Sequence, residues 1–185
     1  MAGTMGEFPQ ELYRGGEIIR RQTTFWDIQT IDEATIRVHF DGKVEFSFGE
    51  SGFPDVELAS SHPLLTEYKS PKDSLYVASS VANPEEVLSD LRSAAVTYFS
   101  SWRPLARYLN DQISAERLLR DGYGLLMRGP REFIADAAAI CCRYGIQVSV
   151  LPGGRTQTLL SALILGQNFV IARAFRFEPM ARRSA

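Results

Sequence analysis

The periodicity of apolar residues changes at Asn83-Pro84, and this change limits the folds open to the chain. Before this point short runs alternate apolar and polar residues, which is typical of strands with one face in a core. After it the apolar residues first recur at helical spacing. The sequence therefore predicts an α+β fold: an N-terminal antiparallel β-meander, then helices and a C-terminal strand–helix–strand unit, arranged as a two-layer sandwich.

The length of 185 residues and a hydrophobic content of 45% allow a core that needs neither disulfides nor metal. We expect a single domain over 1–185, with a β-rich portion at about 12–82, an α/β portion at about 83–178 and a frayed tail at 179–185. No apolar run is long enough to span a membrane, and the first residues lack the pattern of a signal peptide. We therefore expect a soluble, cytoplasmic protein.

The segment 35–48, "TIRVHFDGKVEFSF", gives the clearest hairpin pattern in the chain. A three-residue loop, 40–42, keeps the apolar residues of both arms on one face and places Arg37 opposite Glu45. This loop predicts Gly42 in the left-handed conformation.

Local start and stop signals define the other expected elements. Asn83 and Pro84 are typical of a helix start, and Gly122 and Gly145 of helix ends. Further strands are expected at 23–31, 73–80, 124–128, 146–151 and 168–178, helices after Pro84, at 114–120 and at 130–145, and a loop followed by a helix at 153–166.

Two arginines, Arg128 and Arg131, bracket a Gly-Pro at the expected start of a helix, where the helix dipole already disfavours positive charge. We expect an anion there, bound by Arg128, Arg131, Arg155 and Thr156. Arg155 would complete this site if strands 124–128 and 146–151 are parallel neighbours, because their following turns would then share one edge.

An internal explanation of the same arginines stays open. They could pair with Glu132, with Asp136 or with carboxylates of the acidic first half, and the Gly-Pro would then be only a good helix start.

Arg173 lies among apolar residues in the last expected strand. It shares a strand face with Phe169, Ile171, Phe175 and Phe177, so a buried charge is expected if that face is the core. The alternative is that the strand twists and the side chain reaches solvent.

No residues are assigned to catalysis, to a metal or to a cofactor. The two histidines, His39 and His62, and the adjacent Cys141 and Cys142 do not have ligand spacing. We interpret the cysteines as small core or boundary side chains in a reducing compartment.

The charge is divided unevenly along the sequence. Residues 1–90 hold 16 Asp and Glu against 7 Lys and Arg, whereas residues 91–185 hold 6 against 13. We expect a small interaction module without catalytic activity, such as an inhibitor, immunity-type or regulatory protein, that binds a charged protein partner. The alternative is a protein, enzymatic or not, that binds a phosphate-bearing ligand or, less expected, nucleic acid through the arginine-rich half. No membrane partner is expected.

Overall fold

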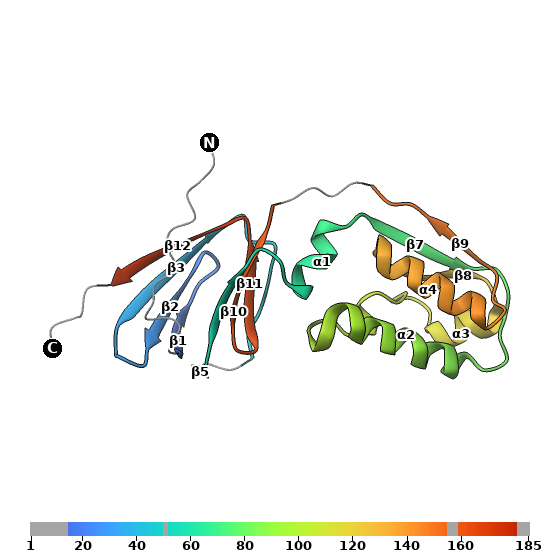
Figure 1. Cartoon of the computed structure of the whole chain (residues 1–185), viewed down its shortest axis with the longest axis horizontal. Helices are drawn as coiled ribbons and strands as arrows, with labels where there is room; N and C mark the ends of the chain where they lie inside the picture. Colours follow the sequence, from blue (N-terminus) through green and yellow to red (C-terminus); the bar gives the residue numbers. More distant parts are fainter. Residues whose placement is uncertain (1–14, 50–51, 155–158, 181–185) are drawn as a thin grey trace. The chain divides into compact units, whose positions relative to one another are not determined.

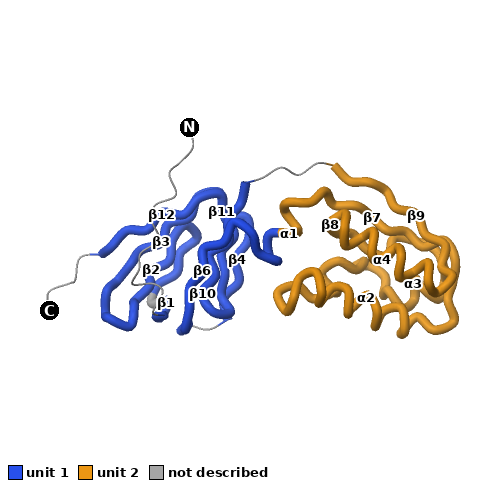
Figure 2. The backbone as a smooth tube through the Cα atoms, in the orientation of Figure 1, with its two compact units in different colours: residues 1–65, 159–185 blue, residues 66–158 orange. Residues whose placement is uncertain are grey.

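The computed structural model describes residues 15–49, 52–154 and 159–180. The chain forms two compact units (Figure 2): unit 1 comprises residues 1–65 and 159–185, and unit 2 comprises residues 66–158. Unit 2 is thus inserted into unit 1. Helices and antiparallel sheets occur together, which confirms the predicted α+β class.

Unit 1 is built from two antiparallel sheets (Figure 1). The five-stranded sheet has the order β12-β3-β2-β1-β5 and the four-stranded sheet the order β4-β11-β10-β6. The strands are β1 (Gly16–Arg21), β2 (Phe25–Thr30), β3 (Thr35–Asp41), β4 (Glu45–Ser47), β5 (Gly52–Phe53), β6 (Val56–Ala59), β10 (Ser161–Leu165), β11 (Asn168–Ala172) and β12 (Ala174–Met180).

The core of unit 1 lies between these two sheets. Trp26, Ile28 and Val38 of the first sheet belong to one buried cluster with Leu163 and Val170 of the second. Burying apolar area of this kind contributes roughly 25 cal/mol per Å². The two sheets therefore stabilise each other as a sandwich.

The predicted hairpin over 35–48 is wrong. β3 pairs with β2 and β12, and the chain then crosses to the other sheet, where β4 pairs with β11. Arg37 consequently lies opposite Asp27, with an ion pair of 2.6 Å, and not opposite Glu45. Gly42, at the crossing, has a φ of 59°, so its predicted left-handed conformation is confirmed.

The C-terminal part of unit 1 also differs from its prediction. The expected helix within 153–166 is replaced by strand β10, and the single strand expected at 168–178 is two strands, β11 and β12, which belong to different sheets. β12 extends to Met180, so 179–180 are part of a strand and not of a frayed tail.

Unit 2 has a three-stranded antiparallel sheet of order β8-β7-β9 with helices on one side (Figure 1). α4 packs on all three strands, and α2 and α4 share a core with the sheet. Its elements are β7 (Lys72–Val77), α2 (Pro84–Phe99), η2 (Ser100–Trp102), η3 (Leu105–Arg107), α3 (Ala115–Asp121), β8 (Gly124–Pro130), α4 (Arg131–Arg143) and β9 (Val148–Leu151); α1 (Pro63–Lys69) spans the division between the units.

The predicted helices of unit 2 are confirmed. α2 begins at Pro84, and α3 begins after Ser114, whose side chain accepts a hydrogen bond from Arg117 N. Gly122 ends α3 with a φ of 71°, and Gly145 follows α4 with a φ of 75°. Cys141 is buried in the core of this unit, and Cys142 is exposed.

β8 and β9 are not neighbours. Both run antiparallel to β7, which lies between them, because α4 carries the chain across β7 before β9 begins. The two strands therefore share a direction, but they do not form the adjacent pair on which the shared anion site depended.

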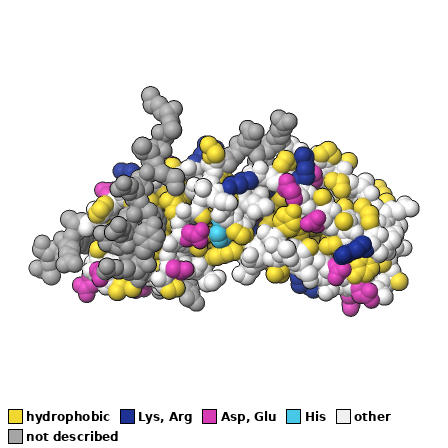
Figure 3. Space-filling model, viewed as in Figure 1, with side chains coloured by type: hydrophobic (Ala, Val, Ile, Leu, Met, Phe, Trp, Pro, Cys, Tyr) yellow, Lys and Arg dark blue, Asp and Glu magenta, His cyan; other side chains and the backbone are white. Residues whose placement is uncertain are grey.

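The charge division of the sequence does not coincide with the two units. Unit 2 holds 10 Asp and Glu against 11 Lys and Arg, and unit 1 holds 12 against 9. On the face drawn in Figure 3, basic and acidic side chains lie among one another. The boundary also differs from the expected one, because β7 belongs to unit 2 and β10 to β12 belong to unit 1. No helix of the described residues is long and apolar enough to cross a membrane.

Candidate functional site

The guanidinium of Arg131 binds an internal carboxylate. Its Nε lies 3.0 Å from Oδ2 of Asp73, a residue of β7 whose side chain is 5% exposed. Gly153 N also donates to Asp73, at 2.8 Å from Oδ1. The hydrogen bond from Arg131 lowers the pKa of Asp73, so the carboxylate stays charged at neutral pH. A protein carboxylate thus lies beside one of the two arginines at the start of α4.

The rival partner considered for Arg131, Glu132, is engaged elsewhere. Ser70 donates to Glu132 Oε2 at 2.6 Å, and this hydrogen bond lowers the pKa of Glu132. The backbone N–H of Arg131 donates to the carbonyl of Pro71 at 2.9 Å. These bonds tie the start of α4 to the chain just before β7.

Arg128 lies on the other face of the sheet. It is paired in register with Ser74, whereas the next residue of β7, Leu75, is buried in the helix-covered core. Neighbouring residues of a strand point to opposite faces, so Arg128 faces away from α4 while Arg131 binds Asp73 on the covered side. Arg128 and Arg131 therefore do not converge on one anion. Arg155 and Thr156 lie outside the described residues.

The side chain of Arg173, considered above either as a buried charge or as one that reaches solvent, is not buried. Arg173 is exposed, at the break where the chain leaves β11 and enters β12. Its side chain lies over Gly42, where an added Cβ would come within 2.8 Å of Arg173 Cδ. The change of sheet at this residue turns the side chain out of the apolar face, which is the alternative considered for it.

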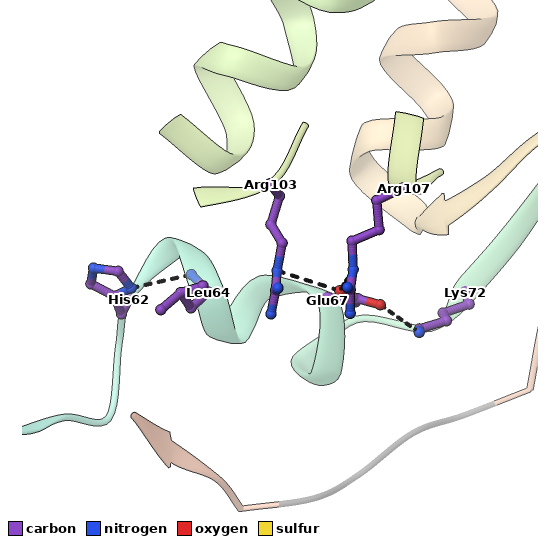
Figure 4. A network of polar contacts seen from close by, with 6 residues as sticks. All are labelled: His62, Leu64, Glu67, Lys72, Arg103 and Arg107. Atoms are coloured by element: carbon purple, nitrogen blue, oxygen red, sulfur yellow. Dashed lines mark hydrogen bonds and ion pairs between the residues drawn. The ribbon is translucent and has the colours of Figure 1, made fainter. Parts of the chain in front are cut away.

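A second ionic cluster, which the sequence did not suggest, surrounds Glu67 of α1 (Figure 4). The Glu67 side chain is only 8% exposed and lies 2.8 Å from Lys72 Nζ, 3.0 Å from Arg107 Nε and 3.7 Å from Arg103 Nε. Arg103 is also buried, whereas the side chains of Lys72 and Arg107 are 50% and 37% exposed. One carboxylate thus forms ion pairs with three cations, two of which reach the surface.

The charge state of Glu67 follows from this arrangement. Burial raises its pKa, but the hydrogen bonds and positive charges of Lys72 and Arg107 outweigh burial and lower the pKa overall. Glu67 therefore remains ionised and joins the α1–β7 segment to the segment around η3. The sequence signal that could have pointed to it is "RPLAR", in which Arg103 and Arg107 flank a proline-started turn.

The two edges of the unit 2 sheet differ in how they are covered. Along β8, Arg128 N donates to Tyr108 O at 2.8 Å, Asn110 N donates to Leu126 O at 3.0 Å, and Leu109 bridges to Met127. Among the strands that the structure describes, β9 pairs with β7 alone. The side chains of Val150 and Leu151 in β9 are 39% and 56% exposed.

The helices described in unit 2 cover one face of the same sheet and leave its other face uncovered (Figure 1). The register aligns its side chains, and we call this group the open sheet face: Ser74, Tyr76, Leu125, Arg128, Ser149 and Leu151. It combines apolar and aromatic groups with one exposed cation. The open sheet face and the β9 edge together form a surface that offers backbone hydrogen-bonding groups, apolar contact and positive charge.

Within the described parts of the chain, no group of three or more His, Cys, Asp or Glu side chains could hold a metal ion. Comparisons of the chain with protein-family models, with curated proteins and with solved structures found no match.

Proposed function

We propose that this chain is a cytosolic interaction module, of the inhibitor, immunity-type or regulatory class, that binds a protein partner on unit 2. An extended segment of the partner pairs with β9, and the partner's apolar and acidic side chains meet the open sheet face. The observation that carries this proposal is the contrast between the covered β8 edge and the β9 edge.

Edge strands present unpaired N–H and C=O groups, and soluble proteins commonly protect them with charges, proline or a covering segment. β9, "VSVL", contains no charged residue or proline. A strand added at such an edge gains affinity from main-chain hydrogen bonds and specificity from alternate side chains. Arg128, on the open sheet face, favours a partner with an acidic side chain.

Selection of peptides from a random display library on the immobilised full chain tests this proposal. We expect enrichment of peptides that alternate apolar residues and carry acidic ones. Leu151→Glu should weaken their binding by about tenfold or more, because an added carboxylate repels the acidic peptide and removes apolar contact. Val96→Glu is the matched control, since Val96 is 59% exposed but lies on α2.

Arg128→Glu should weaken the binding of the same peptides. Arg92→Glu should not, since Arg92 is an exposed arginine of α2. Equal binding of the selected peptides to the Leu151 and Val96 variants, or no enrichment over the Leu151 variant, would show that the partner does not bind at β9.

A second candidate function, binding of a phosphate-bearing ligand, is supported by the Glu67 cluster, in which Lys72 and Arg107 reach the surface. Millimolar phosphate should then raise the melting temperature of the protein by mass action. Lys72→Ala should remove this rise and Arg92→Ala should retain it. An unchanged melting temperature in phosphate would contradict this candidate.

A further inference from the structure

A pocket of about 300 Å³ opens in unit 1, and nothing in the proposed function uses it. It lies between the turn that joins β1 to β2 and the connection by which the chain passes from β3 to β4. We call it the mouth pocket, and its lining residues are Arg21, Gln22, Thr23, Trp26, Phe40, Lys43 and Phe46.

The aromatic residues give the mouth pocket a fixed floor and one accessible wall. Trp26 and Phe40 are 2% and 4% exposed and pack edge to face, with ring centroids 5.9 Å apart. Phe46 lies on the edge strand β4 and is 52% exposed. The floor belongs to the core of the sandwich, so its shape is held by packing, whereas the half-exposed Phe46 ring, which also contacts the Lys43 ammonium, can stack with a ligand.

Both charged residues of the lining are basic. The Arg21 guanidinium carbon lies 3.7 Å from the centroid of the Phe48 ring, and Lys43 Nζ lies 4.4 Å from that of Phe46. Neither side chain forms an ion pair with a carboxylate in the part of the chain that the structure describes. Two cations held against rings at the rim of an apolar pocket attract an anion.

We propose that the mouth pocket binds a small ligand that combines a flat aromatic ring with an anionic group. The ring stacks on Phe46 over the Trp26 and Phe40 floor, and the anionic oxygens accept hydrogen bonds from Arg21 and Lys43. The volume lies at the lower end of the range for small-molecule sites, roughly 300–1,000 Å³. The anion can be the phosphate of a nucleotide or the carboxylate of an aromatic acid, since both present paired oxygens to arginine.

Tryptophan fluorescence of the full chain measures this binding. The chain has two tryptophans, so a Trp102→Phe background leaves Trp26, in the pocket floor, as the reporter. The probes are adenosine monophosphate and naphthalene-2-carboxylate, with adenosine, inorganic phosphate and cyclohexanecarboxylate as partial ligands. We expect at least one aromatic anion to bind about tenfold more tightly than every partial ligand.

Binding of the nucleotide alone identifies phosphate as the anion, and binding of naphthalene-2-carboxylate alone identifies carboxylate; either result supports the proposal. Equal affinity for aromatic anions and partial ligands, or no binding, overturns it. These results are independent of peptide binding at β9, because the mouth pocket and β9 lie in different units.

Matched variants test the two parts of the pocket. Arg21→Ala should lower the affinity for the aromatic anion by about tenfold. Arg20→Ala should not, because the guanidinium of Arg20 lies over Phe25 instead. Phe46→Ser should weaken the binding of the aromatic anion to a similar degree, while Ile31→Ser, at a more exposed apolar site outside the pocket, should not. Circular dichroism checks that each variant is folded. If Phe46→Ser does not fold, Lys43→Ala serves in its place as a second variant at the rim of the pocket. Equal affinities for a variant and its control contradict the proposal.

Discussion

At the scale of single residues, the segment 152–154 passes so close to β7 that only glycine fits at position 153. A Cβ added there would lie 1.6 Å from the carbonyl oxygen of Lys72, whereas a Cβ at Gly154 would meet nothing within 4 Å. The close approach also lets Gly153 N reach the Asp73 carboxylate.

Gly153→Ala should therefore lower the free energy of unfolding by about 1–3 kcal/mol, because the backbone must move away from β7 and the hydrogen bond to Asp73 is strained. Urea unfolding of both alanine variants measures the difference, and Gly154→Ala should remain close to the original protein. Equal losses at positions 153 and 154 would show that the segment does not pack on β7 as described.

The internal carboxylates predict a pH dependence of stability. The pKa values of Asp73 and Glu67 are lowered in the folded chain by their cationic partners, so the unfolded chain takes up protons at a higher pH than the folded chain. Their contribution to stability is present above the unfolded pKa values, about 4, and is lost as the pH falls through the folded ones.

Urea unfolding from neutral pH down to about pH 3 should show this loss, and Asp73→Asn should make the pH dependence shallower while lowering stability at neutral pH. Asp111→Asn, at an exposed position, is the control and should leave the slope unchanged. A slope that is equally steep in the Asp73 variant would mean that its pairing with Arg131 does not persist in solution.

At the scale of secondary-structure elements, the starts of α2 and α3 in unit 2 differ in one hydrogen bond. The Ser114 side chain accepts from Arg117 N at 3.2 Å, whereas the Asn83 side chain makes no capping bond to the α2 backbone and instead donates to Glu86 at 3.1 Å. Pro84 fills the first turn of α2 without needing a partner for an N–H group.

Ser114→Ala should accordingly cost about 1 kcal/mol of unfolding free energy, and Asn83→Ala should cost clearly less. Chemical denaturation of the two variants provides the comparison. A larger loss at Asn83 than at Ser114 would contradict the capping geometry.

The elements that could be predicted from sequence are those whose signals are local. The starts of α2 and α3 and the glycine after α3 depend on neighbouring residues, and all are found as predicted. The prediction at β10 was wrong because "SALIL" is buried on both faces, and a short, continuously apolar run does not distinguish a strand from a helix. The pairing of β3 with β12 depends on a partner far away in sequence, which a local pattern cannot reveal.

The candidate sites show the same limit. Arg131 was recognised as needing a negative partner at a positive helix end, but its partner, Asp73, comes from a strand 58 positions away. Glu67 and Lys72 come from the α1–β7 segment, whereas Arg103 and Arg107 come from the segment around η3, so no single local pattern reveals the cluster. The mouth pocket likewise needs the crossing of the chain between sheets, where a local hairpin was predicted.

At the scale of the whole molecule, each unit has a core of its own. The cluster around Leu91 and Phe133 belongs to unit 2, and the cluster around Trp26 and Leu163 belongs to unit 1. The sequence predicted one domain, and small single domains usually unfold in one transition. Two separate cores instead lead us to expect two transitions, since cooperativity depends on shared packing.

Calorimetry of the full chain, together with one cavity variant in each core, distinguishes these outcomes. Leu91→Ala and Leu163→Ala each truncate a fully buried side chain and should each lower the free energy of unfolding of the unit concerned by about 2–5 kcal/mol. We expect each variant to lower the temperature of a different transition. A single transition that both variants lower would establish one cooperative unit, as the sequence alone suggested.

The insertion of unit 2 into unit 1 also determines the order in which strands can pair while the chain is being synthesised. Phe40 of β3 leaves the ribosome 135 residues before its strand partner Phe175, and β4 waits similarly for β11. Unit 2 is continuous in sequence and can fold during this interval, as domains do during synthesis. β3 and β4 therefore gain their pairing with β12 and β11 late, and a chain that ends before residue 168 would leave the edges and apolar faces that these two strands cover open to water.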